Sequence, residues 1–376
     1  MRPAAAGGDV LLTGATGFVG MELLARYLER TERGVVALVR AADAREADAR
    51  VDEVLENLFA GRARQHRGRV AAVPADLTAP GLGLPLGVRE RIAARVSTIV
   101  HCAASVSFTL PLHEARSINL EGTRRVLELA ELAQRRGGLD RYGHVSTAYV
   151  AGDHCGGFSE RDHDVGQGFH NSYERSKFEA EHLVRRHPHL PATILRPSIV
   201  VGHRTNGWTA AFNVLYWPLR AIAQGLLTAI PAYPTSPLDV VSIDYVADAV
   251  YALCDSAGRA GRTYHLTAGP HVATIGEIAG QAARYFRRPV PEAIPPAEFA
   301  AQPAEGAEAS ARRAGAAYYP YLSLRAVFDS EATRAELEPR GIRASPLGEY
   351  LDRLLDFATR SRWGKRPIAR ANAFAA

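Results

Sequence analysis

Tyr173 and Lys177 lie four residues apart and are the side chains of this sequence best suited to acid–base chemistry. On a helix, residues four apart share one face and lie about one turn from each other. An ammonium beside a phenol favours the phenolate, so we expect the pKa of Tyr173 to fall well below its usual value of about 10. Such a phenol can exchange a proton with a carbonyl or alcohol oxygen during hydride transfer. The same spacing also occurs where an exposed aromatic ring lies beside a solvated lysine, so the context must decide.

A glycine-rich turn near the N-terminus supplies that context. Residues 9–13 form a short apolar run, the segment TGATGFVG follows at 13–20, and apolar residues then recur at helical spacing. Strand, turn and helix in this order are what a dinucleotide-binding turn requires, although the spacing G-x-x-G-x-x-G is one residue wider at its first gap than the usual form. Glycines let backbone amides at a helix N-terminus approach a pyrophosphate. The expected contacts are Thr13, Gly14, Thr16, Gly17, Phe18, Val19 and Gly20.

The second expected strand, residues 34–39, ends at Arg40, twenty residues after Gly20. An acidic residue there would bind the ribose of NAD, whereas an arginine suits the 2′-phosphate of NADP. The alternative is that Arg40 only begins a solvated helix, since Arg45 and Arg50 follow it. We favour the first interpretation and expect NADPH as the cofactor.

Two further strand ends fit the same cofactor. The run at 70–73 leads to Asp76 and Leu77, which we expect to meet the adenine. The run at 97–100 leads to small residues, where the backbone can come close to the ribose and phosphates. These small residues are Cys102, Ala103 and Ala104.

Strand and helix patterns alternate from residue 9 to about residue 197, which predicts repeated strand–helix units and a parallel sheet. The fold class expected is α/β: a Rossmann-like, doubly wound parallel sheet with a smaller, partly helical C-terminal lobe that binds substrate. The dinucleotide-binding domain would cover 1–202, with a return segment at about 238–256, and the second lobe mainly 203–376.

Several elements can be placed within this plan. Long helices are expected near 112–136 and 171–187. A strand at 239–243 is expected to return the chain to the sheet, with Asp244 capping the helix that follows. A terminal amphipathic helix is expected from the leucines between 347 and 355.

The second lobe is less regular. The apolar stretch 207–233 is interrupted by polar residues and proline, which argues against a transmembrane span. It is either a helix buried against the sheet or the wall of an acyl-binding pocket. Residues 295–316, rich in Pro, Ala, Glu and Gly, predict a mobile loop or lid, and the tyrosines at 318–321 would close over substrate or pack on the surface. The basic tail 361–376 is expected to be frayed.

Composition excludes several classes of function. A chain of 376 residues with 47% hydrophobic and 23% charged residues is ordinary for a soluble globular protein. No apolar core of 7–15 residues precedes the first strand, so a secretory signal is not expected. Cys102, Cys155 and Cys254 show no paired spacing, which indicates reduced thiols and a cytoplasmic location.

The net charge of +5 comes mainly from scattered arginines, with no basic stripe interleaved with aromatic residues that would bind nucleic acid. A modest positive field would steer an anionic partner. Two groups of possible ligands, one around His154 and His163 and the other at His187 and His189, lack convincing metal-ligand spacing, so no metal site is expected.

Taken together, these motifs resemble those of the extended short-chain dehydrogenase/reductases. Within that superfamily the chain is most similar to fatty acyl-CoA reductases and to the thioester reductase domains of carrier-protein assembly lines, through ALVR, HCAASVSF, STAYV and LDVVSIDYVADAV. The likeness covers roughly 9–360 and weakens after about 270. The motifs that carry it are TGATGFVG (13–20), HCAA (101–104), INLEGT (118–123), VSTAYV (145–150), YERSK (173–177) and LRPSIVVG (195–202).

The resemblance implies a role for each matching residue. Thr147 would be the active-site hydroxyl, Tyr173 the proton donor, Lys177 its partner and the ligand of the nicotinamide ribose, Asn119 the anchor of a water, and Pro197 and Ser198 the loop beside the nicotinamide. It also implies an NADPH-dependent oxidoreductase that reduces an acyl thioester, with the product open between the aldehyde and the alcohol that a second reduction would give.

The substrate and its partner remain open at this stage. No adenylation or carrier domain is fused to the sequence, so we expect the thioester to arrive on coenzyme A or on a separate carrier protein. No integral membrane segment is expected, and the oligomeric state is open between monomer and homodimer.

Other functions share the same motifs. The alternative enzyme is an NAD(P)-dependent sugar-nucleotide epimerase or dehydratase, or a hydroxysteroid-type dehydrogenase. Arg40 argues against epimerases that retain NAD, and the apolar stretch 207–233 argues against a sugar nucleotide. A regulator that binds the dinucleotide without turnover is a third possibility, against which Thr147, Tyr173 and Lys177 speak.

Overall fold

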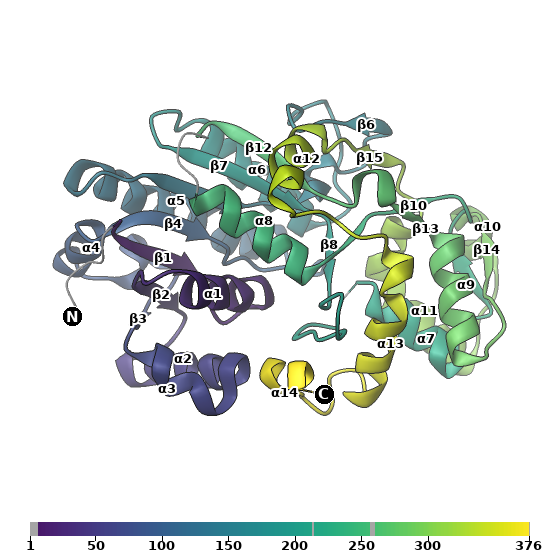
Figure 1. Cartoon of the computed structure of the whole chain (residues 1–376). Helices are drawn as coiled ribbons and strands as arrows, with labels where there is room; N and C mark the ends of the chain where they lie inside the picture. Colours follow the sequence, from purple (N-terminus) through teal and green to yellow (C-terminus); the bar gives the residue numbers. More distant parts are fainter. Residues whose placement is uncertain (1–6, 213, 256–259, 376) are drawn as a thin grey trace.

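A seven-stranded parallel sheet forms the centre of the computed structural model, which describes residues 7–212, 214–255 and 260–375 (Figure 1). The strands are β1 (Asp9–Thr13), β2 (Val35–Val39), β3 (Val70–Pro74), β4 (Val96–His101), β5 (Arg141–Val145), β7 (Ala192–Pro197) and β12 (Arg262–Leu266). Their order across the sheet is β12-β7-β5-β4-β1-β2-β3. The winding direction therefore reverses between β1 and β4, and α/β sheets bind ligands at the carboxyl ends of the strands at such a point.

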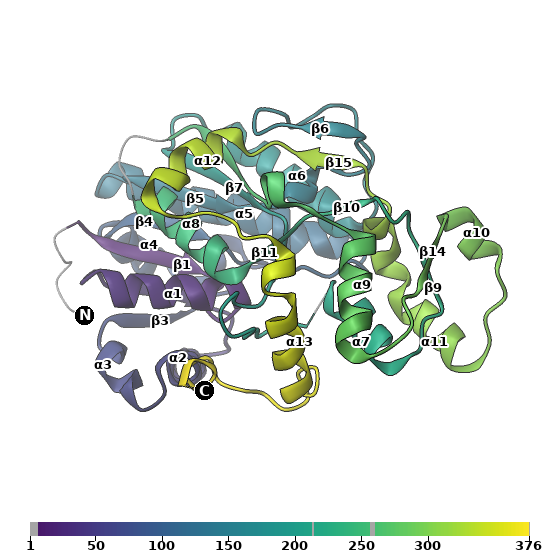
Figure 2. The same cartoon turned by 45° about the vertical axis from the view of Figure 1, so that its right-hand side comes forward.

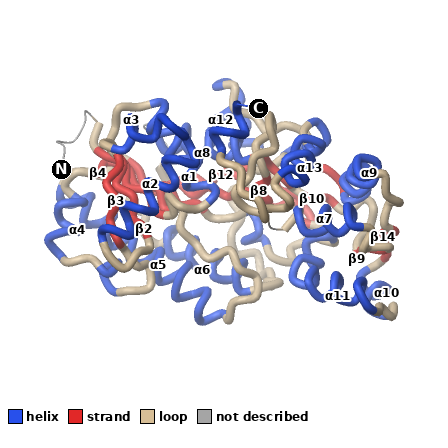
Figure 3. Tube along the Cα trace, turned by 90° about the horizontal axis from the view of Figure 1, so that it is seen from below, coloured by secondary structure: helices blue, strands red, loops and turns tan. Residues whose placement is uncertain are grey.

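Helices cover both faces of this sheet, as Figure 3 shows from below. The buried side chains of α1 (Phe18–Arg30), α2 (Ala44–Phe59) and α8 (Ile243–Asp255) share one hydrophobic core with the sheet. Those of α4 (Leu86–Ala93), α5 (Leu112–Arg136) and α6 (Ser172–Arg185) share another. The predicted doubly wound α/β fold is confirmed, as are the long helices expected near 112–136 and 171–187.

The second lobe lies at one end of the sheet, to its right in Figures 1 and 2. Its main helices are α7 (Tyr216–Gln224), α9 (Ile275–Phe286) and α13 (Leu351–Arg360), which share a core through Leu219, Ile278 and Leu354. Two small sheets lie within this lobe; they pair β9 (Ala229–Pro231) with β14 (Glu292–Ile294) and β10 (Pro237–Leu238) with β13 (Ala273–Thr274). A third pairs β15 (Ala326–Phe328) of the lobe with β6 (Gly156–Phe158) of the preceding part of the chain. The apolar stretch 207–233 thus contributes one short buried helix, while residue 213 lies outside the described residues.

The strand expected at 239–243 is present but does not join the central sheet. It is β11 (Val240–Ser242), which pairs with β8 (Ile199–Val201), and the strand that returns to the central sheet is β12, beside β7. Asp244 does not cap α8, because the helix has already begun at Ile243. Its carboxylate instead pairs with the Arg204 guanidinium at 2.9 Å.

The prediction of a mobile loop at 295–316 is wrong. This segment forms α10 (Pro296–Ala301) and α11 (Gly306–Gly315). Proline is tolerated in the first turn of a helix, and alanine, glutamate and arginine favour helices. In α11, Glu308 and Arg312 form an i,i+4 ion pair at 2.8 Å that supports the helix.

The frayed tail expected at 361–376 is also wrong for the residues that the structure describes. A last helix, α14 (Arg370–Ala375), docks on the half of the molecule that contains the central sheet, where Arg370 pairs with the buried Glu22 at 2.6 Å. The sequence predicts a solvated tail because Glu22, the acidic partner of Arg370, lies near the other end of the chain.

Among the described helices, none combines the length and the apolar character needed to cross a lipid bilayer. The expected domain ranges also include residues 1–6, 213, 256–259 and 376, which lie outside the described part of the chain.

Candidate functional site

The glycine turn connects β1 to α1 and is shaped to receive an anion. Gly14 has a φ of +77°, a left-handed conformation that favours glycine, and Gly17 is the N-cap of α1. A Cβ on Gly20 would lie 1.9 Å from the carbonyl oxygen of Gly14, so no larger residue fits. The first N–H groups of α1 have no carbonyl partner within the helix, and such a helix N-terminus attracts phosphate. The turn therefore fits a dinucleotide pyrophosphate.

The ends of β1 and β4 are joined by a chain of hydrogen bonds beneath this turn. The Thr13 hydroxyl oxygen accepts from the backbone N–H groups of Cys102 and Ala103, both at 3.1 Å, so its own hydrogen points to His101 Nδ1 at 2.8 Å. His101 Nε2 then donates to Thr123 at 3.1 Å. Burial lowers the pKa of His101 to about 3, which keeps this imidazole neutral. Sequence reasoning missed the role of His101, although the residue stands in the HCAA motif.

The predicted adenine edge is assembled from the ends of β2 and β3. Hydrogen bonds from Thr78, together with the charges of Arg125 and Arg40, lower the pKa of Asp76. Arg40 is exposed, and its charge acts on Asp76, so the two predicted residues face the same region. The carbonyl of Leu77 accepts a hydrogen bond from Arg125 at 2.8 Å. Arg125 is a second cation at this edge that sequence reasoning missed.

Tyr173 and Thr147 come together from α6 and the end of β5. Thr147 follows β5 and is the N-cap of a short 3-10 helix, where it accepts from the N–H of Tyr149 at 3.2 Å. Burial raises the pKa of Tyr173 to about 12, and the neighbouring Thr147 hydroxyl offsets only part of the rise. The lowered pKa that the Tyr–Lys spacing predicted is therefore wrong for this structure. A phenol with a raised pKa is protonated at neutral pH, which suits a proton donor.

Lys177 lies one turn along α6 from Tyr173 and is buried. Its ammonium donates to the carbonyl oxygen of Val145 at 2.8 Å, which holds α6 against the end of β5. Burial lowers the pKa of Lys177 to about 8. The amine thus changes charge close to neutral pH, where an exposed lysine would remain fully protonated.

Asn119 is buried on α5 and is held by three hydrogen bonds. Its amide nitrogen donates to the Ser105 carbonyl at 3.0 Å and to the Ser176 hydroxyl at 2.9 Å, while its oxygen accepts from the Ser105 N–H at 2.8 Å. Both amide hydrogens are thereby used. The side chain fixes the loop after β4 to α6 beside Lys177.

Pro197 and Ser198 connect β7 to β8. The Thr147 hydroxyl donates to the Pro197 carbonyl at 3.4 Å, so the end of β7 lies against the end of β5. Ser198 is buried, and its N–H donates to the carbonyl oxygen of Leu266 at 3.3 Å, at the end of β12. The predicted nicotinamide loop therefore lies beside Thr147 in the structure.

A fully buried ion pair lies beside Thr147 and Lys177 and links the elements that carry them. Arg196 and Glu181 pair at 2.6 Å, and Ser146, next to Thr147, donates to Glu181 at 2.9 Å. Although burial opposes its ionisation, Arg196 lowers the pKa of Glu181 to about 2. Glu181 lies one turn beyond Lys177 on α6, so the pair links α6, β5 and β7. Neither residue was singled out from the sequence.

Aromatic rings continue from Tyr173 into the second lobe. The ring of Phe108 lies 5.7 Å from Tyr173, 5.0 Å from Tyr321 and 5.6 Å from Tyr318, measured between centroids. Trp217 of α7 follows at 6.5 Å from Tyr318. The predicted tyrosine cluster and the apolar stretch 207–233 thus meet near Tyr173. Phe108, which joins them, was quoted within HCAASVSF but given no role.

The buried carboxylate of Glu174 holds Tyr321 in this cluster. The Tyr321 hydroxyl donates to Glu174 at 2.5 Å and accepts from the Asn171 amide at 2.9 Å. The Glu174 carboxylate also accepts from the backbone N–H of His170 at 2.8 Å. The residue next to the proposed proton donor thereby ties the second lobe to α6.

A cavity of about 460 Å³ opens elsewhere, between α9 and residues 346–351. Its lining includes Glu277, Ile278 and Arg284 but none of the predicted catalytic or cofactor-binding residues. It is therefore separate from the site around Tyr173.

Comparisons with known proteins agree with this geometry. A family model described as "Male sterility protein", for an NAD-binding domain, matches residues 12–250. Fatty acyl-CoA reductase wat of Drosophila melanogaster is 28% identical over 277 residues, which are 65% of this chain and 53% of that protein. Isonitrile lipopeptide synthase of Streptomyces coeruleorubidus is 36% identical over 224 residues, 58% of this chain and 15% of that protein.

Among solved structures, the terminal R domain from the myxalamid PKS-NRPS biosynthetic pathway superposes with a TM-score of 0.81. It is 25% identical and covers 97% of this chain and 94% of that one. The chain spans about half the length of the fatty acyl-CoA reductases that it matches and a smaller part of the synthases.

Proposed function

The chain belongs to the Male sterility protein family of extended short-chain dehydrogenase/reductases, and we propose that it reduces an acyl thioester with NADPH. An oxidoreductase that uses a nicotinamide cofactor is what the family and the glycine turn support. The observation that carries the proposal further is the placement of Thr147 against the Tyr173 phenol, beside the carboxyl ends of β5 and β7.

The preference for NADPH rests on Arg40. This exposed guanidinium follows β2, where the 2′-phosphate of a dinucleotide bound at the glycine turn would lie. The second cation near Asp76, Arg125, adds positive charge to the same edge. A bound NADPH would supply the hydride that the acyl carbon accepts.

Thr147 and Tyr173 act on the carbonyl oxygen of the substrate. As this oxygen gains negative charge, it accepts hydrogen bonds from both hydroxyls, and loss of one such donor commonly costs about 3–4 kcal/mol of barrier. Tyr173, protonated at neutral pH, then gives its proton to the oxygen. The resulting hemithioacetal breaks its carbon–sulfur bond, releasing an aldehyde and a free thiol. A second reduction at the same residues would give the alcohol.

Lys177 and Asn119 prepare these two hydroxyls. The Lys177 ammonium is directed by its bond to the carbonyl of Val145, two residues before Thr147, and would hold the nicotinamide ribose on its other side. Asn119 keeps the loop after β4 against α6. Because both its amide hydrogens are used, a bound water that returns a proton to the site would have to donate to an oxygen of this residue. Both residues act through position and charge while Tyr173 exchanges the proton.

The acyl group would lie along the aromatic rings that leave Tyr173. Phe108, Tyr318 and Trp217 are only partly buried, so they offer apolar surface to a ligand. We assign substrate binding to the lobe formed mainly by 203–376 and cofactor binding to 1–202 with the segment 238–256. The thiol carrier would be coenzyme A or the phosphopantetheine of a carrier protein.

The test is NADPH oxidation against matched acyl-coenzyme A and acyl-carrier thioesters, with the aldehyde captured and the thiol titrated. We expect equal amounts of thiol and oxidised cofactor when the aldehyde is trapped. Turnover of simple aldehydes alone would contradict the thioester step. Turnover of a sugar nucleotide without net NADPH consumption would instead support the epimerase alternative.

A further inference from the structure

The last described residues of the chain lie against the dinucleotide-binding half. Residues 368–374 form a C-terminal strap that includes most of α14, and α14 contacts α2 (Figures 1 and 2). The backbone N–H of Arg370 donates to the Asn57 side chain of α2 at 3.0 Å. Ala373 is buried in the same core as α1 and α8. The strap is therefore a packed element of this half.

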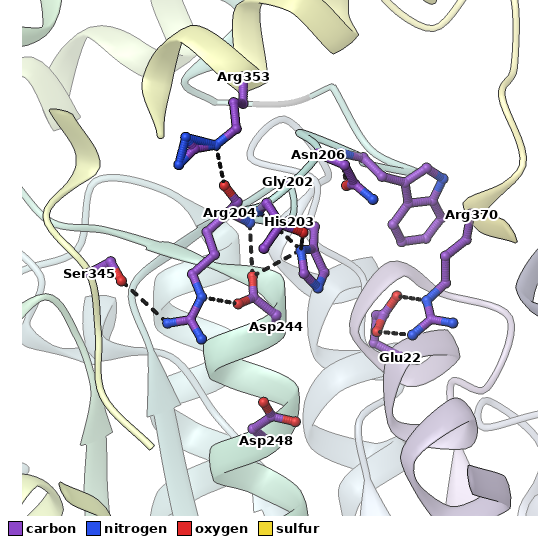
Figure 4. Close-up of polar contacts among 12 residues, drawn as sticks. Glu22, Gly202, His203, Arg204, Asn206, Asp244, Asp248, Ser345, Arg353 and Arg370 are labelled. Atoms are coloured by element: carbon purple, nitrogen blue, oxygen red, sulfur yellow. Dashed lines mark hydrogen bonds and ion pairs between the residues drawn. The ribbon is translucent and has the colours of Figure 1, made fainter. Parts of the chain in front are cut away.

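Arg370 fastens the strap to α1 through a buried ion pair with Glu22 and a longer, more exposed one with Glu29 at 3.5 Å. The Arg370 guanidinium donates to both carboxylate oxygens of Glu22, at 2.6 and 3.4 Å (Figure 4). Glu22 is fully buried and already pairs with Arg26 on its own helix. Glu22 therefore has a cationic partner on α1 besides Arg370, although Arg26 is shared with Asp248. What the second, two-pronged contact adds is a fixed geometry between the strap and α1.

A second contact joins the strap to the glycine turn through a tryptophan. The indole N–H of Trp208 donates to the carbonyl oxygen of Ile368 at 3.0 Å. On its other side the Trp208 ring packs on Phe18, with centroids 5.7 Å apart. Phe18 is the first residue of α1 and directly follows Gly17. Phe18 and Glu22 are four residues apart and share a face of α1, so the two contacts act on the same turn of helix.

The rest of the Trp208 loop is held by other elements. Arg204 pairs with Asp244 of α8, and its carbonyl accepts from Arg353 of α13 at 2.8 Å (Figure 4). A Cβ on Gly207 would lie 2.0 Å from the carbonyl oxygen of Arg353, so this loop passes close against α13. Within the loop, the backbone of Trp208 is held by hydrogen bonds to His203 and Asn206, both at 2.9 Å. The strap adds the bond that fixes the indole ring.

We propose that Arg370 is a positioning residue for dinucleotide binding. By holding the strap on α1, it seats Trp208 against Phe18 and keeps the first turn of α1 in the conformation that receives the pyrophosphate. This role concerns dinucleotide affinity and does not depend on the identity of the acyl substrate. It applies equally to NADPH and NADH, because the pyrophosphate is common to both.

The test is calorimetric titration of NADPH and NADH into four variants, at a temperature well below each measured melting midpoint. Arg370→Ala is expected to raise both dissociation constants about tenfold, and Arg370→Lys to recover part of the loss. Trp208→Phe keeps a ring on Phe18 but removes the bond to Ile368, and we expect it to raise both constants several-fold. Arg366→Ala is the matched control, because Arg366 is an exposed arginine just before the strap, and it should bind as the unchanged protein does.

The double variant decides between positioning and general destabilisation. Because both changes release the same strap, Arg370→Ala with Trp208→Phe should bind no more weakly than the weaker-binding single variant, within twofold. Dissociation constants of Arg370→Ala equal to those of Arg366→Ala would overturn the proposal, as would a double-variant loss equal to the product of the single losses. Should Arg370→Ala not fold, Arg370→Lys and Trp208→Phe decide the matter, and wild-type affinity in both would refute the role of the strap.

Discussion

The dinucleotide-binding half and the second lobe position their functional residues in different ways. In the first, most of the proposed cofactor and catalytic residues lie at or just after the end of a strand of one parallel sheet, so neighbouring strand ends bring Thr13, Cys102 and Thr147 to the same edge. In the second, residues reach the site through side-chain contacts across long stretches of chain, such as Tyr321 with Glu174. A regular sheet fixes positions through its backbone, whereas the lobe depends on individual buried polar pairs.

This difference predicts where substitutions do the most damage. In the first half, the backbone itself forms the binding surface, so an added methyl group can block it. The apolar surface proposed for the acyl group is shared by several rings of the second lobe and its junction. Replacing one ring by alanine should therefore weaken substrate binding only in part. The predictions below test this contrast.

The largest effect is expected from Gly20→Ala. Its Cβ would collide with the carbonyl oxygen of Gly14, and the turn that receives the pyrophosphate would have to move. We expect dinucleotide affinity to fall by roughly 100-fold or more, which corresponds to about 2.7 kcal/mol. Gly61→Ala is the control, since a Cβ there meets no atom within 4 Å. If Gly20→Ala binds NADPH as Gly61→Ala does, the turn is not the pyrophosphate site.

Arg40→Asp should separate the two cofactors. Loss of a charged hydrogen-bond donor, with a repulsive carboxylate in its place, should weaken NADPH binding by roughly 10–100-fold and leave NADH nearly unchanged. Arg45→Asp, at an exposed position five residues later, controls for the general change in charge. An equal effect of Arg40→Asp on both cofactors would make this residue a surface charge.

The pH dependence of reduction should report Lys177. Its pKa is lowered to about 8 by burial, so the ammonium is charged below that pH and loses its proton as the pH rises through it. If the charge is needed, the rate should fall above pH 8, by up to about tenfold per pH unit. In Lys177→Arg the cation persists, so any remaining activity should keep its rate to higher pH. The same descending limb in both proteins would assign it to another group.

The smallest effect is expected where the aromatic rings of the second lobe meet the loop after β4, from Phe108→Ala. Aromatic pairs contribute about 0.5–1.5 kcal/mol beyond the area they bury, so we expect KM for the thioester to rise roughly three- to tenfold. Dinucleotide affinity should not change. Val106→Ala, at an exposed apolar position of the same loop, is the control. An effect as large as that of Gly20→Ala would erase the contrast between the two regions.

Sequence reasoning worked best where function follows local order. The strand at Asp9–Thr13, the glycine turn and the helix after it appear as predicted, because a buried strand, a Cβ-free turn and an amphipathic helix each have a local signature. Tyr173 and Thr147 are also brought together, on adjacent elements of one sheet edge. The roles of these residues remain predictions.

It worked less well where a distant partner or burial decides the outcome. Arg370 pairs with Glu22, 348 residues away in the sequence, and Tyr321 bonds to Glu174, 147 residues away. Composition and local spacing do not predict contacts between residues so far apart in the sequence. The pKa of Tyr173 was predicted in the wrong direction because spacing shows the nearby lysine but not the loss of solvent around the phenol. The prolines of 295–316 favour a loop in sequence, but Pro296 begins α10 and Pro303 lies between α10 and α11, so neither interrupts a helix.

The most direct test of the proposed chemistry is Tyr173→Phe, studied by calorimetric NADPH binding and by single-turnover reduction of an acyl thioester. The substitution removes one hydroxyl and keeps the ring that packs against Phe108. We predict NADPH affinity within twofold of the unchanged protein and a reduction rate lower by roughly 100- to 1,000-fold. A reduction rate close to that of the unchanged protein would contradict the assignment of Tyr173 as the proton donor.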